Sequence, residues 1–238
     1  MKSKFTRRTL IALFAVSALV LSACSSGSSD KKAGGDVKVS LITKDQTNPF
    51  FVAMIKGAKD KAASLGVDLT IASGKQEGDD ASQIAAIENA ISAKHAGILI
   101  TPMSVNVNDA IKKARAAGLF VIALDTPTDP ADIVDITFAT NNCEAGELIG
   151  KWAAAKLGGK KAVIALLDIF NDRMVSVDYC RDNGFLKGMG IDVKNPKIMG
   201  DEAKTGKYSG GDYVIVGNKA TGANEAGGRT GLEQLLAK

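Results

Sequence analysis

The chain has 238 residues, of which 45% are hydrophobic, and its 30 basic and 26 acidic side chains give a formal net charge of +4. Four of the basic residues, Lys2, Lys4, Arg7 and Arg8, lie in the first 23 residues, which contain no acidic residue, so 26 basic and 26 acidic side chains remain in the rest of the chain. Such a balanced body has no basic field to attract a nucleic acid, and we expect no nucleic-acid partner.

The N-terminus has the pattern of a lipoprotein signal peptide. A basic start is followed by an apolar run over residues 10–21, which is too short for a stable membrane span. The residues Leu21-Ser22-Ala23-Cys24 resemble the bacterial lipobox, in which cleavage precedes the cysteine and its thiol carries a diacylglycerol. We therefore predict a signal peptide over residues 1–23 and a lipid on Cys24, the alternative being a cysteine that happens to follow an ordinary signal peptide.

A polar stretch follows the predicted lipid site. Residues 25–35 contain Ser, Gly, Lys and Asp with a single alanine, which is typical of a flexible linker. The sequence thus predicts a tether over residues 24–35 that holds the body at the outer face of the cell membrane, outside the cytoplasm.

The body alternates apolar strand-like runs with amphipathic helix-like runs. Strands are predicted at residues 37–43, 67–72, 97–101, 119–124, 133–139, 161–167 and 213–216, and helices at 50–65, 81–94, 107–117, 144–157, 175–189 and 225–237. Between residues 200 and 222 the pattern breaks into Gly, Lys, Asp and Tyr around the last of these strands. Continuous apolar strands between helices predict an α/β fold with parallel sheets covered on both faces.

The turn Lys44–Phe51 between the first strand and the first helix is the first candidate site. It offers two aromatic rings, an amide, a carboxylate and an ammonium group, a set that suits a sugar, because rings pack on its C–H surface and polar groups bond its hydroxyls. The alternative is purely structural: Asn48 caps the helix, Pro49 is its first residue, and Phe50 and Phe51 belong to the core.

Two further strands end on polar residues. Thr101-Pro102 follows the strand at 97–101, and Asp125-Thr126-Pro127 follows the strand at 119–124. Right-handed crossovers bring the ends of parallel strands to one edge of the sheet, where α/β proteins bind small ligands. Each of these residues alone would be an ordinary loop residue, but their convergence with the Lys44–Phe51 turn favours a binding site.

A fresh series of strands and helices begins near Asn142. In it, Arg181 lies in a predicted helix and presents a forked set of donors that suits hydroxyl groups, or else forms a surface ion pair with Asp178 or Asp182. Cys143 and Cys180 are the cysteines of the body, and in an exported chain they form either a disulfide or two buried free thiols.

No motif for catalysis or for a metal is evident. The single histidine, His95, lies at a predicted helix end, which suits a helix-dipole or solvent-facing role. The acidic run over residues 75–80 has too few spaced ligands for a calcium loop. We therefore expect a protein that is not an enzyme and that uses neither a metal nor a cofactor.

Several motifs resemble one known family, the periplasmic sugar-binding proteins of ABC importers in the ribose-binding group. They are Asn48-Pro49-Phe50-Phe51, Thr101-Pro102, Ala123-Leu124-Asp125-Thr126-Pro127 and Cys180-Arg181-Asp182-Asn183-Gly184-Phe185. The stretches over residues 125–132 and 145–150 are similar to fructose-binding members in particular. The resemblance implies two Rossmann-like lobes, joined by a hinge and closing on a sugar, with an N-terminal lobe over residues 36–139 and a C-terminal lobe over 140–238.

The resemblance also implies roles for individual residues. The matching residues of the family bind sugar hydroxyls at Asn48, Asp125 and Arg181 and line the sugar face at Phe50 and Phe51. Thr101 stands where ribose binders have an asparagine, and Thr126 where they have an arginine, so a ribose-like or fructose-like monosaccharide is expected rather than ribose itself. Family members also continue beyond the point matching Lys238, so a chain that lacks the C-terminal part of the fold is expected.

The function that follows is capture of a monosaccharide by a lipid-anchored monomer that delivers it to the permease subunits of an ABC importer. A sugar-sensing protein, or a truncated receptor without a transport role, is the alternative. Sugar-dependent transcription regulators share the fold, but they require an N-terminal helix-turn-helix where this sequence has a signal peptide.

Overall fold

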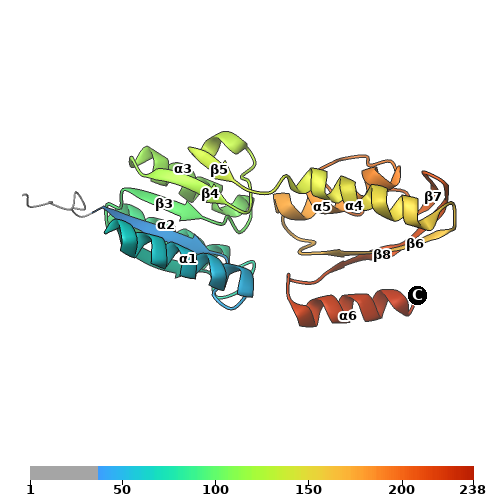
Figure 1. Cartoon of the computed structure of the whole chain (residues 1–238), viewed down its shortest axis with the longest axis horizontal. Coiled ribbons are helices and arrows are strands. Elements are labelled where there is room, and N and C mark those ends of the chain that lie inside the picture. Colours follow the sequence, from blue (N-terminus) through green and yellow to red (C-terminus); the bar gives the residue numbers. More distant parts are fainter. Residues whose placement is uncertain (1–36) are drawn as a thin grey trace, which may run out of the picture. The chain divides into compact units, whose positions relative to one another are not determined.

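The computed structural model describes residues 37–238, so the predicted signal peptide, the lipid site at Cys24 and the tether lie outside the described residues. Two sheets form within the described part (Figure 1). We call the five-stranded sheet and its helices the first lobe, and the three-stranded sheet and its helices the second lobe. None of the helices in residues 37–238 combines the length and the apolar character needed to cross a membrane.

The first lobe contains an all-parallel sheet in the order β2-β1-β3-β4-β5. Its strands are β1 (Lys38–Thr43), β2 (Asp68–Ser73), β3 (Gly97–Ile100), β4 (Phe120–Leu124) and β5 (Ile136–Phe138). Its helices are α1 (Pro49–Leu65), α2 (Asp80–Ser92) and α3 (Asn108–Ala116), with short 3-10 turns at Val105–Val107 and Ala131–Ile133. The predicted α/β architecture is therefore confirmed.

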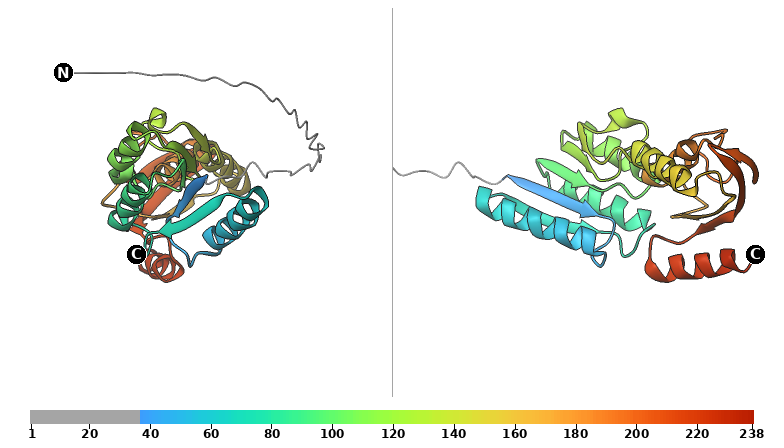
Figure 2. Two further views of the ribbon diagram at one scale, coloured as in Figure 1. Left: turned by 90° about the vertical axis from the view of Figure 1, so that its left-hand side faces the viewer. Right: turned by 45° about the vertical axis from the view of Figure 1, so that its right-hand side comes forward.

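Helices cover both faces of this first sheet. Ile42 packs in one apolar cluster with residues of α2 and α3, including Ile87 and Ile111, each at most 1% exposed. Leu41, its neighbour in β1, is equally buried but points to the opposite face, because successive strand residues alternate. Figure 2 shows α1 on that opposite side of the sheet.

The second lobe contains the sheet β6-β8-β7, built from β6 (Ala162–Asp168), β7 (Thr205–Tyr208) and β8 (Gly211–Ala220). Its helices are α4 (Asn142–Leu157), α5 (Ser176–Met189) and α6 (Glu225–Leu236). α4 and α5 lie on one side of the sheet and α6 on the other (Figures 1 and 2). β6 and β8 are parallel, whereas β7 and β8 form an antiparallel hairpin.

This hairpin departs from the prediction. The Gly-rich region was expected to hold one short strand at 213–216, but β8 is longer and β7 precedes it. Gly210, at φ 126°, provides the tight turn that lets the two strands pair. The sequence hides the strand character of β7, because the strand contains a glycine and a lysine and three of its four residues are exposed.

The packing of α4 on α5 depends on four glycines. A Cβ atom built at Gly146 would lie 2.5 Å from the carbonyl oxygen of Arg181, and one at Gly184 would lie 2.5 Å from that of Cys143. Cβ atoms at Gly150 and Gly188 would lie even closer to the opposing backbone. The two helices therefore touch backbone to backbone, and a disulfide between Cys143 and Cys180 joins them, which settles the question the sequence left open.

Candidate functional site

The turn after β1 is fixed by its own side chains. Oδ1 of Asp45 accepts hydrogen bonds from the backbone N–H of Thr47 at 2.6 Å and of Asn48 at 2.7 Å, and from the Thr47 hydroxyl at 3.0 Å. Oδ1 of Asn48 in turn accepts from the Phe50 N–H at 3.0 Å and so caps α1, with Pro49 as its first residue. The turn is therefore rigid before any ligand arrives.

The side chain of Gln83, in α2, bridges the carboxyl ends of β1 and β3. Its side chain is fully buried, and Nε2 donates to the carbonyl oxygens of Thr43 at 3.3 Å and Thr101 at 3.0 Å. Its Oε1 accepts from the Met103 N–H at 2.8 Å. A helix residue thus fixes two strand ends, and through them it positions the polar residues that follow.

A buried ion pair lies directly beyond those strand ends. Nζ of Lys44 is 3.0 Å from Oε1 of Glu77, and the two side chains are only 3% and 10% exposed. The opposite charges attract at this distance, so each group reduces the cost of burying the other. Burial raises the pKa of Glu77 more than the nearby Lys44 lowers it.

Asp125 follows β4 at the same edge of the sheet. Its backbone adopts a left-handed conformation with φ 62°, and one carboxylate oxygen accepts a hydrogen bond from the Thr126 hydroxyl at 2.9 Å. Its charge acts on Glu77, whose pKa it helps to raise. A strained backbone at this position costs free energy and is common at binding sites.

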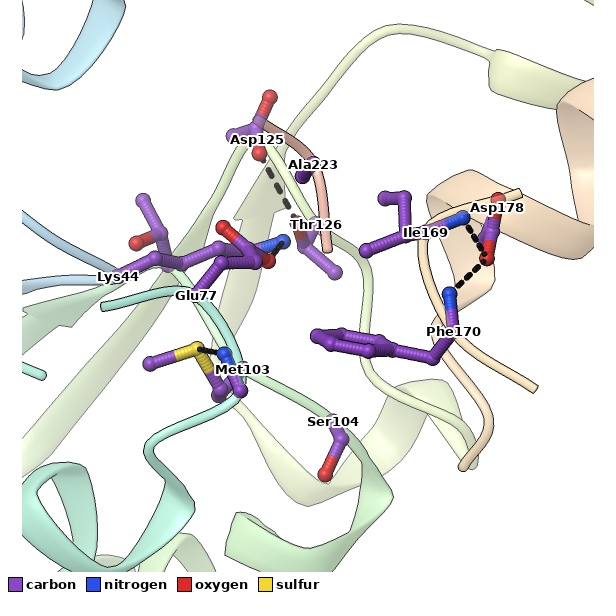
Figure 3. A network of polar contacts seen from close by, with 12 residues as sticks. Lys44, Glu77, Met103, Ser104, Asp125, Thr126, Ile169, Phe170, Asp178 and Ala223 are labelled. Atoms are coloured by element: carbon purple, nitrogen blue, oxygen red, sulfur yellow. Dashed lines mark hydrogen bonds and ion pairs between the residues drawn. The ribbon is translucent and has the colours of Figure 1, made fainter. Parts of the chain in front are cut away.

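The second lobe contributes an aromatic ring and a guanidinium from the loop after β6. Oδ2 of Asp178 fixes this loop by accepting from the N–H groups of Ile169 at 2.8 Å and Phe170 at 3.2 Å. The Arg173 guanidinium lies 4.8 Å from the centre of the Phe170 ring. Figure 3 shows this ring pointing toward Lys44, Glu77 and Met103 of the first lobe.

These loops surround a hollow of about 710 Å³. Its walls come from the turn after β1, the loop after β2, the loop after β6 and the segment before α6, and the lining residues are Asp45, Thr47, Asn48, Pro49, Lys75, Gln76, Glu77, Gly78, Phe170, Arg173, Gly222, Ala223, Asn224 and Glu225. We call this space the central hollow. Its polar wall with one aromatic ring suits a small ligand rich in hydroxyl groups.

The structure places the predicted site residues in different surroundings. Asn48 lines the central hollow, and Asp125 shares its edge of the sheet. Thr101 is fully buried at the end of β3, and its hydroxyl oxygen finds no hydrogen-bond partner within residues 37–238. Phe51 is buried in the core at 4% exposure, while Phe50 is 53% exposed and meets it edge to face.

Arg181 lies elsewhere. Its Nε donates to Oδ1 of Asn142 at 2.9 Å, and it lines a separate cavity of about 290 Å³ with Asp168, Asp178 and Asp182. The structure therefore does not bring Arg181 to the central hollow together with Asn48. The ligand roles given to these residues by resemblance stay predictions.

The sequence analysis missed Glu77, Phe170 and Arg173 as site residues. Glu77 and Phe170 each follow a predicted strand end, the same signal that drew attention to Thr101 and Asp125. Arg173 carries no such signal, because its position depends on how the loop after β6 folds. Within residues 37–238, His, Cys, Asp and Glu side chains form no group of three or more that could hold a metal ion.

Two α/β lobes with a polar hollow at the strand ends define a class of α/β ligand-binding protein. The family model for the periplasmic binding protein domain matches residues 39–238. The chain belongs to the periplasmic binding protein family, a family of binding proteins rather than of enzymes.

Curated relatives agree with this family. The chain is 29% identical over 135 residues to the D-allose-binding periplasmic protein of Escherichia coli, covering 54% of this chain and 43% of the relative. It is 26% identical over 216 residues to the D-apiose import binding protein of Actinobacillus succinogenes, covering 81% and 66%. It is also 30% identical over 155 residues to the ribose import binding protein of Escherichia coli, covering 65% and 50%. The chain thus spans between 43% and 66% of the length of these relatives.

Solved structures show the same fold. A solute-binding protein of an ABC transporter from Burkholderia graminis, in complex with D-arabinose, aligns with a TM-score of 0.68 at 24% identity, covering 86% of this chain and 63% of that one. A galactofuranose-binding protein aligns with a TM-score of 0.68 at 21% identity, covering 84% and 62%.

Proposed function

We propose that this protein binds a small, uncharged sugar in the central hollow. The observation that carries the proposal is the convergence of loops from both lobes on one space lined by an amide, carboxylates and an aromatic ring. Carboxylate and amide groups bond sugar hydroxyls, and the Phe170 ring offers a flat face to the C–H surface of a sugar. A volume of about 710 Å³ lies within the usual range for small-molecule sites.

The charges around the hollow favour a neutral ligand. Lys44, beside the hollow, pairs with Glu77, and Arg173 in its wall pairs with Asp80 and Asp172, while the remaining cation of the lining, Lys75, is exposed to solvent. Asp45 and Glu225 add further negative charge to the lining. A sugar acid or a sugar phosphate would therefore meet acidic side chains without a free buried cation to balance them.

The substrate class is a pentose or hexose of the ribose or fructose type. The relatives are named for allose, apiose and ribose, which are all monosaccharides. The polar groups at the hollow are rigidly placed, as the Asp45 turn and the Gln83 bridge show, so they can distinguish hydroxyl arrangements.

The proposal extends to location and partners. The predicted lipid on Cys24 would anchor the body to the outer face of the cell membrane, where it delivers sugar to the permease subunits of an ABC importer. Import binding proteins among the relatives support this role. Labelled palmitate should enter the wild-type chain in bacteria but not the Cys24→Ala variant.

Isothermal titration calorimetry with ribose, fructose, allose and arabinose tests the binding proposal. We expect micromolar affinity for at least one of them and none for glucuronate or ribose 5-phosphate. Asp125 follows β4 at the sheet edge beside the hollow, and we infer that it accepts a hydrogen bond from a sugar hydroxyl there; Asp125→Ala should then weaken binding by about 2–4 kcal/mol, because sugar hydroxyls would be buried without a partner. Failure of all neutral sugars to bind a correctly folded protein would refute the proposal.

A further inference from the structure

The loop after β6 meets the first lobe at several points. Nη1 of Arg173 donates to the carbonyl oxygen of Gly78 at 2.7 Å and to Oδ2 of Asp80 at 3.1 Å. Next to it, the Val105 N–H donates to the carbonyl oxygen of Met174 at 3.4 Å. A side chain and a backbone group thus join the two lobes on the rim of the central hollow.

Arg173 is oriented by its own lobe. Its Nε and Nη2 each donate to one carboxylate oxygen of Asp172 at 3.0 Å, and its guanidinium stacks over the Phe170 ring. The side chain is only 24% exposed. Because the fork is held in place by Asp172 and Phe170, little conformational entropy is lost when the remaining nitrogen binds the first lobe.

The acceptors on the first lobe are equally fixed. Oδ1 of Asp80 accepts from the Ser104 hydroxyl and Oδ2 from the Asn106 amide, both at 2.9 Å. Gly78 has φ 86°, and a Cβ there would lie 3.0 Å from the Phe170 ring. Only a glycine lets the ring and the guanidinium approach this closely.

We propose that Arg173 is a latch: a positioning residue whose contacts with Gly78 and Asp80 favour the joined arrangement of the two lobes around the central hollow. The expected effect on sugar affinity rests on the proposed sugar site, whereas the Arg173 contacts between the lobes do not depend on that site. Four of the five N–H groups of Arg173 already donate to Asp172, Gly78 and Asp80, so the guanidinium contributes to the joined arrangement rather than to discrimination between sugars. Weakening the latch should lower affinity for every sugar by a common factor and leave the order of preference unchanged.

Amide hydrogen exchange measured by NMR tests the latch directly, without a ligand. The Val105 N–H bonds across the lobes, whereas the Met103 N–H bonds to Gln83 inside the first lobe. In Arg173→Met we expect exchange at Val105 to accelerate about tenfold or more, with Met103 unchanged. Arg229→Met, which removes an 81% exposed arginine paired with Glu233 on α6, should change neither amide.

Two outcomes would overturn the latch. One is unchanged exchange at Val105 in Arg173→Met, and the other is a loss of affinity for one sugar alone, which would make Arg173 a direct ligand contact. If Met103 also lost protection, Arg173→Lys would replace the first variant, and its Val105 exchange should fall between the wild-type and expected Arg173→Met values. If no sugar binds the wild type, the proposed function fails, while the exchange measurement still decides the latch.

Discussion

The two lobes treat their buried polar groups differently. In the first lobe, Gln83 uses both ends of its amide, and Asp45 accepts three hydrogen bonds with one oxygen. In the second lobe, both carboxylate oxygens of Asp182 and one oxygen of Glu202 are buried without a hydrogen-bond partner in residues 37–238. The first lobe also has buried oxygens without such a partner, but they belong to the Thr101 and Thr128 hydroxyls and to Glu77, which is paired with Lys44, whereas the Asp182 carboxyl has neither a hydrogen bond nor an ion pair in the described residues.

The two sheets also differ in how many of their strands are paired on both sides. β1, β3 and β4 each have a neighbour on both sides, but β6 pairs only with β8. Val163 and Leu167 on β6 are 68% and 44% exposed, and Trp152 on α4 is 58% exposed. The first lobe has exposed apolar strand residues as well, Phe120 and Phe138, so the clearest difference between the lobes is the unpaired Asp182 carboxyl of the second.

Removing the Gln83 bridge should have the largest effect. Gln83→Ala leaves the Thr101 carbonyl and the Met103 N–H without their side-chain partner and the Thr43 carbonyl with only the 3.4 Å bond from the Gly74 N–H, so we expect a loss of about 3–5 kcal/mol in the free energy of unfolding. Urea denaturation followed by circular dichroism measures this loss. Gln234→Ala, on an exposed position of α6, is the control and should change stability by less than about 0.5 kcal/mol. A small effect of Gln83→Ala would mean that the first lobe is less dependent on polar satisfaction than its geometry indicates.

Replacing Asp182, the unpaired acid of the second lobe, should raise the stability of the protein rather than lower it. Burial, with a smaller contribution from Asp168 and Glu202, raises the pKa of Asp182 from 3.8 to about 8. The folded state thus resists ionisation, and stability that is complete below pH 4 is lost as the pH rises toward 8. Asp182→Asn should remove this loss and stabilise the protein by about 2–4 kcal/mol at pH 8.

Melting temperatures from pH 4 to pH 9 check the sign. The difference between Asp182→Asn and the wild type should be near zero at the acidic end, grow with pH and level off above the Asp182 pKa of about 8. An exposed carboxylate, Asp60 on α1, gives the control Asp60→Asn, which should show no such trend. A constant difference at all pH values would show that Asp182 is not held neutral.

The next largest effect on stability is expected at the glycine contacts between α4 and α5. Gly150→Ala forces a Cβ into the backbone of α5, and the helices must separate, at a cost of about 2–3 kcal/mol. Gly57→Ala is a matched control, because a Cβ there meets no atom within 4 Å. In the middle of α1 it should stabilise by about 0.5–1 kcal/mol. Thermal denaturation of both variants tests the contrast, which fails if the two substitutions shift the melting temperature alike.

The sequence predicts much of this fold because apolar periodicity and turn chemistry are local. The positions of β1, α1, β4 and α4 follow from apolar runs, and Asn48 and Pro49 mark the start of α1 as expected. Positions set by long-range packing were less accessible. The β7–β8 hairpin depends on Gly210, and the disulfide requires α4 and α5 to meet through glycines.

The candidate site shows the same limit. Asn48 and Asp125 could be predicted as neighbours because each follows a strand, and the carboxyl ends of parallel strands lie at one edge of the sheet. The Lys44–Glu77 pair and the Arg173 contacts join segments that are 33 to 95 residues apart in sequence, and no local pattern indicates them. Arg181 was predicted as a site residue from its position on a helix. That position alone could not decide whether its side chain faces the central hollow or the separate cavity that it lines.

Asn48 has two roles that a pair of substitutions can separate, and the expected effects are the smallest. Its Oδ1 caps α1, while its amide nitrogen makes no hydrogen bond within residues 37–238 and borders the central hollow. Asn48→Asp keeps an acceptor for the Phe50 N–H and should leave stability within about 0.5 kcal/mol of the wild type, whereas Asn48→Ala should cost about 1 kcal/mol. If the amide also bonds a sugar, both variants should bind about tenfold more weakly by calorimetry, since both lack that donor. Unchanged binding in Asn48→Asp would assign Asn48 to helix capping alone, and the first lobe would then present its carboxylates, rather than this amide, to the ligand.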